Sequence, residues 1–228
     1  EFHGLGIAGP KSRDLLQKIV REDVSNNNFK FRDSRRMYVA GVPAIVNRLS
    51  FTGELGYEIY VAPHFQIKLY EELLEAGKEF NIKPFGSRAL MSMRLEKNWG
   101  AWTLDYRPDF TAKETGLDIF INWDKEFIGK TVSLKEKENG AKKHLSVLEI
   151  ETEIDVSGDE AVMHNGKCVG YVTSGGYGHS VSKSLAMTYL PVELIDEDTE
   201  LEVEILGKFH QASVVMKPLY DPSGSKMR

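Results

Sequence analysis

The sequence has 228 residues, 41% hydrophobic and 28% charged, which is typical of a globular protein with one large domain or two small ones. Its single cysteine, Cys168, excludes an intramolecular disulfide and a multi-cysteine zinc site, and the net charge of −5 disfavours a broad nucleic-acid-binding face. No apolar run approaches the roughly 18 residues of a membrane helix, and no signal peptide is visible. We therefore expect neither nucleic-acid nor membrane partners.

The first part of the chain alternates between predicted strands and helices. Proline fits the first position of a helix because its missing N–H would have no partner there. A glycine that follows a helical pattern of apolar residues predicts the end of the helix, because glycine readily adopts the left-handed conformation found there. In chain order we predict a strand at residues 5–8, a helix from Pro10, strands at 36–39 and 44–49 around an Ala-Gly-Val-Pro turn, a strand at 56–61, a helix from Pro63 to Gly77 with Ile67, Tyr70, Leu73 and Leu74 buried, and a helix at 84–97.

The pattern changes after a charged run at residues 135–143. Short strand candidates follow, and evenly spaced short strands favour a small barrel or sandwich. They lie at residues 144–151, 167–172, 184–189, 200–206 and 211–216. We therefore predict an α+β fold, with a mixed α/β unit at residues 1–140 and an all-β unit at 141–228. Because the chain lacks an initiator methionine and begins in a predicted strand, we expect it to be the C-terminal part of a longer polypeptide.

The most informative stretch is Ser-Phe-Thr-Gly-Glu-Leu-Gly-Tyr-Glu-Ile at residues 50–59. Its two glycines permit a turn, Glu54 and Glu58 stand four residues apart around it, and Phe51 and Tyr57 add aromatic faces. A carboxylate accepts a bidentate pair of hydrogen bonds from adjacent N–H donors, as at the edge of a pterin. The alternative is a solvent-exposed hairpin tip without function.

A second cluster lies between residues 86 and 102. Arg88 falls in the first turn of a predicted helix, where its charge opposes the helix dipole and requires a carboxylate or a ligand anion. We expect Arg94 and Glu96 to form a structural ion pair. Trp99 and Trp102 either belong to the core or form a stacking wall for an aromatic ligand.

Other candidate sites favour structural interpretations. The sequence has no phosphate-binding loop, and its six histidines lack metal-ligand spacing. The glycine-rich residues 174–178 predict a tight hairpin connection. Cys168 lies in a predicted strand, and we expect it to be a buried small apolar group.

Four segments, in order, resemble the aminomethyltransferase (glycine-cleavage T-protein) superfamily. They are Phe-Thr-Gly-Glu-Leu-Gly-Tyr-Glu at 51–58, Gly-Ser-Arg-Ala-Leu-Met-Ser-Met-Arg-Leu-Glu-Lys at 86–97, Phe-Ile-Gly-Lys at 127–130 and Val-Gly-Tyr-Val-Thr-Ser-Gly-Gly-Tyr-Gly-His-Ser-Val-Ser-Lys-Ser-Leu-Ala-Met at 169–187. This resemblance covers nearly the whole chain. It implies a folate-binding α/β body, to which residues 1–140 contribute, followed by an antiparallel β-barrel at 141–228.

Two further segments resemble dimethylglycine and sarcosine dehydrogenases. Asp-Phe-Thr-Ala-Lys-Glu-Thr-Gly-Leu at 109–117 is similar to their Pro-Leu-Glu-Ala-Gly-Leu segment, and residues 218–228 are similar to their ending. In those enzymes an N-terminal flavin domain oxidises an N-methyl amine, and a C-terminal domain captures the released one-carbon unit on tetrahydrofolate. The resemblance implies that this chain is part of the folate domain.

The resemblance also implies roles for individual residues. Glu58 matches the glutamate that binds the pterin, and Arg88 matches an arginine associated with substrate or folate binding. Phe51 stands where the family often has a tyrosine, so it keeps the ring and lacks the hydroxyl. Trp99 lies near a position that is often aromatic and close to folate. The family's catalytic aspartate lies upstream of this chain, and neither Asp14 nor Asp23 matches its context.

The expected function is tetrahydrofolate-dependent one-carbon transfer, with an amine substrate and with FAD in a missing N-terminal domain. Alternatives are an aminomethyltransferase that works with a lipoyl carrier protein, methyl transfer from a sulfonium compound, and a non-enzymatic folate-binding module. The expected location is the cytoplasm, or the mitochondrial matrix if a transit peptide precedes the chain.

Overall fold

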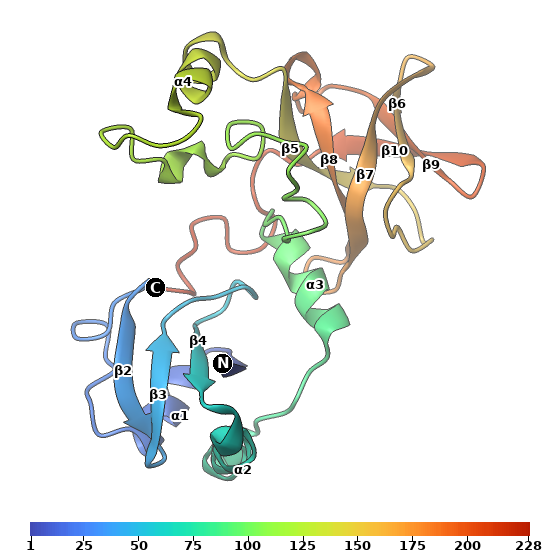
Figure 1. Ribbon diagram of the computed structural model, residues 1–228. Helices are drawn as coiled ribbons and strands as arrows, with labels where there is room; N and C mark the ends of the chain where they lie inside the picture. The colour runs from blue at the N-terminus through green and yellow to red at the C-terminus, as the bar shows by residue number, and fades with distance from the viewer. The chain divides into compact units, whose positions relative to one another are not determined.

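The computed structural model describes residues 1–228, with ten strands and four α-helices (Figure 1). In chain order the main elements are β1 (His3–Ala8), α1 (Ser12–Ile19), β2 (Ser34–Val39), β3 (Val42–Asn47), β4 (Gly56–Val61), α2 (Gln66–Gly77), α3 (Ser87–Glu96), α4 (Lys130–Asn139), β5 (Lys143–Ile150), β6 (Ala161–His164), β7 (Lys167–Gly178), β8 (Lys183–Pro191), β9 (Leu201–Ile205) and β10 (Lys208–Val214). Single turns of 3-10 helix lie at Pro63–Phe65, Lys78–Phe80, Leu117–Phe120 and Val192–Leu194. No helix has the length and apolar character needed to cross a membrane.

The chain divides into two compact units. The first consists of Glu1–Met93 and Asp221–Arg228, and the second of Arg94–Tyr220, so the division falls within α3. The barrel strands begin at Lys143 within the second unit. The predicted domain boundary between residues 140 and 141 stays a proposal.

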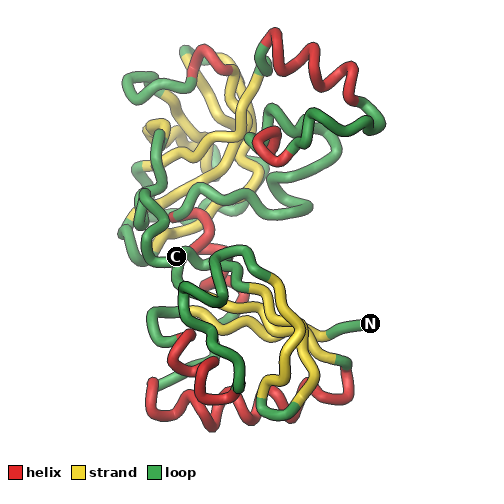
Figure 2. The backbone as a smooth tube through the Cα atoms, turned by 90° about the vertical axis from the view of Figure 1, so that its left-hand side faces the viewer, coloured by secondary structure: helices red, strands yellow, loops and turns green.

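The first unit is an antiparallel sheet in the order β1-β4-β3-β2, with α1 and α2 on one face (Figure 2). Alternation along β4 sends Tyr57, Ile59 and Val61 into the core beneath the helices. The helices contribute their own buried leucines to the same core, including Leu16 and Leu69. The opposite face of β4 therefore carries Glu58 and Tyr60.

The second unit holds a closed antiparallel barrel in the order β10-β5-β8-β7-β6-β9 (Figure 1). Its interior is apolar, with side chains such as Leu148, Val172, Ala186 and Val203. Closure leaves no free sheet edge. A mixed α/β body followed by an antiparallel barrel confirms the predicted fold class.

The observed elements differ from the predicted ones at two glycine-rich sites. The β2–β3 turn consists of Ala40 and Gly41 alone, both with positive φ, and Pro43 lies inside β3. Residues 174–178 are extended strand within β7 rather than a hairpin connection. Glycine is required there because a Cβ on Gly175 would lie 2.7 Å from the carbonyl oxygen of Val156.

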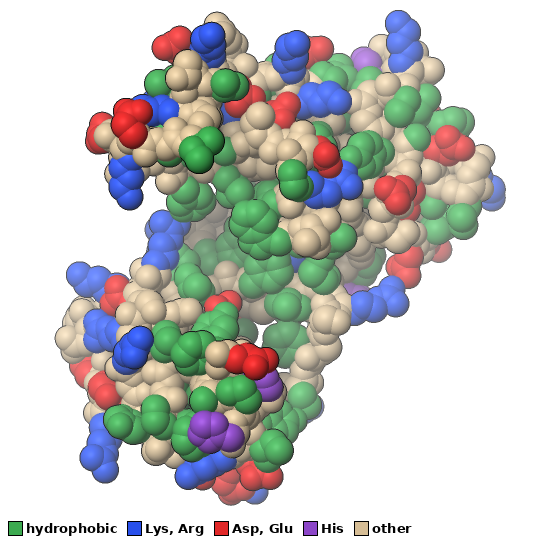
Figure 3. All heavy atoms as spheres, viewed as in Figure 1, with side chains coloured by type: hydrophobic (Ala, Val, Ile, Leu, Met, Phe, Trp, Pro, Cys, Tyr) green, Lys and Arg blue, Asp and Glu red, His purple; other side chains and the backbone are tan.

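Charged side chains of both signs are interspersed over the face shown in Figure 3. The one cysteine, Cys168, is exposed on β7, which corrects the prediction that it is buried. Its thiol lies 3.3 Å from the carbonyl oxygen of Gly170. Val169, the residue after this cysteine, packs against the barrel core, and adjacent side chains of a strand point to opposite faces, so Cys168 faces outward.

Candidate functional site

A cavity of about 710 Å³ lies in the first unit beside the edge strand β1. Its walls come from β1, β4, α1, α2, the loop at residues 49–52 and the segment at residues 80–87. Residues that line these walls include Phe51, Glu58, Tyr70 and Phe85. A volume of this size is within the range of small-molecule binding sites, and apolar walls with few polar groups are typical of them.

The carboxylate of Glu58 is held in place by Tyr60, two residues further along β4. Residues two apart on a strand share a face, and the Tyr60 hydroxyl donates a hydrogen bond to Glu58 Oε2 at 2.9 Å. This hydrogen bond is the main cause that raises the pKa of Tyr60 above its ordinary value of 10.0, and burial of the side chain is the second cause. Glu58 Oε1 makes no hydrogen bond within the chain, and Oε2 accepts only the bond from Tyr60, so both oxygens of this fixed carboxylate can still accept hydrogen bonds.

Glycines on β1 create space next to this carboxylate. Gly6 pairs with Glu58 across β1 and β4, and a Cβ built on Gly6 would have no heavy atom within 4 Å. Gly4 pairs with Tyr60, and a Cβ on Gly4 would lie 3.0 Å from the Tyr60 ring. The absence of side chains at these positions leaves room for Tyr60 to lie over the strand and for a flat group beside Glu58.

Three of the six predicted binding residues line this cavity, namely Phe51, Tyr57 and Glu58. The sequence predicts that Tyr57 places an aromatic face beside Glu58, but the Tyr57 side chain points to the opposite face of β4 and packs in the core. Its side chain is 1% exposed and its ring stacks on Phe29 with centroids 5.8 Å apart. Its buried hydroxyl makes no hydrogen bond.

The other three predicted residues are not among those that line this cavity. Glu54 has Lys226 Nζ 3.5 Å from its Oε1 atom. Arg88 is exposed in the first turn of α3, next to Ser87, which does line the cavity. Trp99 belongs to the second unit, where Lys97 Nζ lies 5.7 Å from the centre of its ring.

Arg94 forms a buried ion pair with Asp105 rather than with Glu96. Arg94 Nη1 lies 2.6 Å from Asp105 Oδ2, and both side chains are almost completely buried. Burial lowers the pKa of Arg94, and the negative charge of Asp105 opposes this effect. Glu96 instead accepts a hydrogen bond from the main-chain N–H of Ser180 at 2.7 Å.

Sequence reasoning missed Tyr60 and Gly6 as parts of the site. The spacing of two between Glu58 and Tyr60 was an available signal, because it places both side chains on one face of a strand. Gly6 carried no such signal, since its role depends on the pairing of β1 with β4. No group of three or more His, Cys, Asp or Glu side chains is placed to hold a metal ion.

Family comparisons agree with this architecture. Residues 1–125 match the family model described as the GCVT N-terminal domain, and residues 143–221 match the glycine cleavage T-protein C-terminal barrel domain. The chain belongs to the aminomethyltransferase (glycine-cleavage T-protein) family. This membership confirms the resemblance stated from the four sequence segments.

The relatives include both enzyme types that the sequence suggested. Human mitochondrial dimethylglycine dehydrogenase is 40% identical over 222 residues, which are 96% of this chain and 26% of that protein. The aminomethyltransferase of Thermoanaerobacter sp. (strain X514) is 32% identical, over 99% of this chain and 61% of that protein. This chain thus spans about a quarter and about three fifths of their lengths.

A solved structure supports the same relationship. The crystal structure of glycine cleavage system aminomethyltransferase T from Bartonella henselae superposes with a TM-score of 0.86. It is 26% identical in sequence, and the match covers 97% of this chain and 60% of that one. The chain therefore has the fold of this aminomethyltransferase, and its relatives in sequence include both transferases and dehydrogenases.

Proposed function

We propose that this chain binds tetrahydrofolate in the cavity of the first unit. It would serve one-carbon transfer as the C-terminal folate-binding part of a dimethylglycine or sarcosine dehydrogenase. The observation that carries the proposal is Glu58, a residue that lines the cavity and whose carboxylate is fixed by Tyr60 and keeps capacity to accept further hydrogen bonds.

The chemistry of the cavity suits a pterin. A pterin presents adjacent N–H donors along one edge, and an ionised carboxylate is the strongest acceptor for such an edge. Glu58 would accept these hydrogen bonds, Phe51 would supply an apolar ring, and the space above Gly6 would admit a flat group. When bound, tetrahydrofolate supplies the N5 and N10 nitrogens that take up the one-carbon unit.

The contribution of this chain to the reaction is mainly positional. Holding the folate at a fixed place converts capture of a released one-carbon unit into an effectively intramolecular step. Roles of Trp99 and Arg88 in folate binding stay predictions from the family resemblance. The catalytic aspartate and the FAD are proposed to lie in upstream parts of the longer polypeptide.

Identity with the relatives favours a dimethylglycine dehydrogenase over the stand-alone transferase. The mammalian dimethylglycine dehydrogenases are 40–41% identical to this chain, whereas mouse sarcosine dehydrogenase is 32% identical and three bacterial aminomethyltransferases are 32–36% identical. An aminomethyltransferase of the glycine cleavage system is the second candidate. A flavin spectrum in the complete polypeptide, and methylenetetrahydrofolate formed from dimethylglycine, would support the dehydrogenase. Product formed only with an aminomethylated lipoyl carrier would support the transferase.

Replacement of Glu58 by glutamine tests the proposed anchor. Hydrogen bonds to a charged group contribute about 1.5–3 kcal/mol, so E58Q should weaken tetrahydrofolate binding by about tenfold or more in calorimetric titration. Glutamine keeps the acceptor for Tyr60, so the fold should persist.

The matched control is Glu71→Gln on the exposed face of α2, which should leave the affinity unchanged. Equal affinities for E58Q and the unaltered protein would remove Glu58 from the site.

The cellular location is proposed as cytoplasmic, with the mitochondrial matrix as the alternative. The mammalian relatives carry the word mitochondrial in their names. Subcellular fractionation of the source cells distinguishes the two locations.

A further inference from the structure

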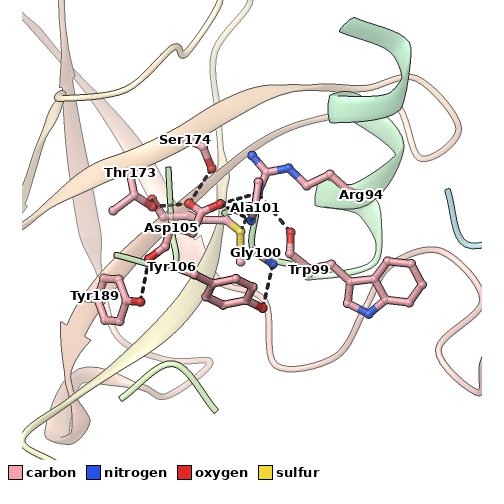
Figure 4. Close-up of polar contacts among 10 residues, drawn as sticks. Arg94, Trp99, Gly100, Ala101, Asp105, Tyr106, Thr173, Ser174 and Tyr189 are labelled. Atoms are coloured by element: carbon pink, nitrogen blue, oxygen red, sulfur yellow. Dashed lines mark hydrogen bonds and ion pairs between the residues drawn. The ribbon is translucent and has the colours of Figure 1, made fainter. Parts of the chain in front are cut away.

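Two arginine side chains are almost completely buried, and only one of them has an acidic partner. Arg94 is paired with the carboxylate of Asp105 (Figure 4). Arg48, which immediately follows strand β3 in the first unit, forms no ion pair. A buried cation is costly unless hydrogen-bond acceptors replace the water that it has lost. The first unit must therefore supply such acceptors to Arg48.

The acceptors of Arg48 are main-chain carbonyls, and one of them comes from residues 221–228, the C-terminal segment. Arg48 Nη1 donates to the carbonyl of Phe29 at 2.6 Å, and Nη2 donates to the carbonyl of Met227 at 3.4 Å. Burial lowers the pKa of Arg48, and its Nε atom makes no hydrogen bond. The carbonyl of the C-terminal segment is thus one of only two acceptors for a buried charge.

The C-terminal segment has a hydrogen-bonded turn of its own. Asp221 Oδ1 accepts from the N–H and the hydroxyl of Ser225 at 3.1 and 2.8 Å, and Asp221 Oδ2 accepts from the N–H of Lys226 at 3.2 Å. Gly224 has a φ of 65°, and a Cβ at this position would lie 2.9 Å from Met227 Cε. These contacts hold Lys226 and Met227 in a fixed conformation.

The residues that follow Arg48 form one wall of the cavity in the first unit. Residues 49–52 all line the cavity, and the loop then turns at Gly53, where φ is 86°. At the end of this turn, Lys226 Nζ lies 3.5 Å from Glu54 Oε1. The C-terminal segment therefore contacts the loop at both of its ends, at Arg48 and at Glu54.

We infer that the C-terminal segment positions the cavity wall at residues 49–52, and with it the ring of Phe51 against a bound ligand. The inference rests on the proposed function, in which this ligand is tetrahydrofolate. All the residues involved belong to the first unit. Lys226 and Met227 are positioning residues, because they contact the ends of the loop and are not among the residues that line the cavity.

The physical reason is the conformational entropy of the loop. A loop that is held at both ends samples fewer conformations than one held at a single end, so less ordering remains when a ligand binds. If the contact with Lys226 is lost, the loop conformation that accepts the ligand is less populated. The apparent affinity then falls in proportion to that population.

Charge reversal of Lys226 tests this contact. The Lys226 side chain is half exposed, so K226E buries no new charge, and its carboxylate repels Glu54. In protein labelled with 4-fluorophenylalanine, the Phe51 signal is assigned among the eleven phenylalanines with F51L. We expect the Phe51 fluorine resonance to shift or broaden in K226E, and the dissociation constant for tetrahydrofolate to rise about threefold to fivefold, because a partly exposed ion pair is weak. The charge swap K226E/E54K should restore both readouts.

Lys78→Glu is the matched control. Lys78 forms an exposed ion pair with Glu75 in the same unit, and it is not among the residues that line the cavity. The variant changes the net charge by the same amount as K226E, so it reports any long-range effect of charge on an anionic ligand. The Phe51 resonance and the affinity should stay unchanged.

Each result decides the inference. An unchanged Phe51 resonance in K226E, a change equal to that in K78E, or a swap that fails to restore both readouts overturns the positioning role. A displaced Phe51 with unchanged affinity shows that the segment does not serve the ligand, and overturns the inference too. If the unaltered protein binds no tetrahydrofolate, the proposed function fails, and the resonance alone still reports whether the C-terminal segment positions Phe51.

Discussion

Helix geometry decides which acid pairs with Arg94. Residues two apart on a helix point in different directions, so Arg94 and Glu96 do not face each other. Arg94 reaches Asp105 in the following turn, and Glu96 binds the main chain at Ser180. The short distance in sequence suggested the wrong partner. The correct partner becomes neighbouring only when residues 99–106 fold back on the helix.

Replacement of Arg94 by methionine should destabilise the protein by about 3–5 kcal/mol, because it leaves the Asp105 carboxylate buried without its cationic partner. The free energy of unfolding, measured by urea denaturation, reports this loss. Lys78→Met is the control, since it removes the exposed ion pair with Glu75 and should cost less than about 1 kcal/mol. Similar losses in both variants would contradict a special cost for the buried pair.

At the scale of elements, helix α2 shows where periodicity succeeds and where it fails. Its position is close to the prediction, but the buried face consists of Leu69, Leu73 and Gly77, whereas Ile67 is 73% exposed. Gly77 does not end the helix in the left-handed conformation, because its φ is −83° and the positive φ falls on Asn81. Glycine is needed at position 77 because Ile82, in the chain that follows the helix, packs directly against it.

Replacement of Gly77 by alanine should destabilise the protein by about 1–3 kcal/mol through overpacking, although alanine is the better helix former. A Cβ at this position would lie 2.5 Å from Ile82 Cγ2 and 2.7 Å from Ile82 Cβ. Thermal unfolding of G77A, Ile82→Ala and the double variant completes a double-mutant cycle, which measures the energetic coupling between the two positions. A stabilised G77A variant, or additive losses, would contradict the clash.

At the scale of the whole molecule, the chain leaves the first unit within α3 and re-enters it at Asp221. The returning segment has specific contacts there, because Met227 is 7% exposed and its carbonyl accepts from Arg48 Nη2 at 3.4 Å. Arg48 is itself buried and also donates to the carbonyl of Phe29 at 2.6 Å. The last eight residues are therefore part of the fold of the first unit.

Replacement of Met227 by alanine should destabilise the first unit by about 2–5 kcal/mol, as for other buried large-to-small changes. Differential scanning calorimetry measures this as a lower melting temperature for the first unit, while the second unit keeps its transition. Met216→Ala, at an exposed methionine of the second unit, is the control and should change little. Unchanged melting of the first unit in M227A would contradict the packing of this segment.

By itself, the sequence determined the features that depend on local pattern. Alternation and turn residues located most strands, with β4 found at its observed bounds, and ordered motifs identified the family and pointed to Glu58. The short β6 was missed, because four residues carry too little periodicity.

Only the tertiary structure decided the features that depend on residues distant in sequence. It paired Gly6 with Glu58, sent Tyr57 to the core, and joined Thr173 and Ser174 to Asp105. A bulge or a cross-strand neighbour arises from the register between strands, and register is set by the packing of a whole sheet rather than by any one segment.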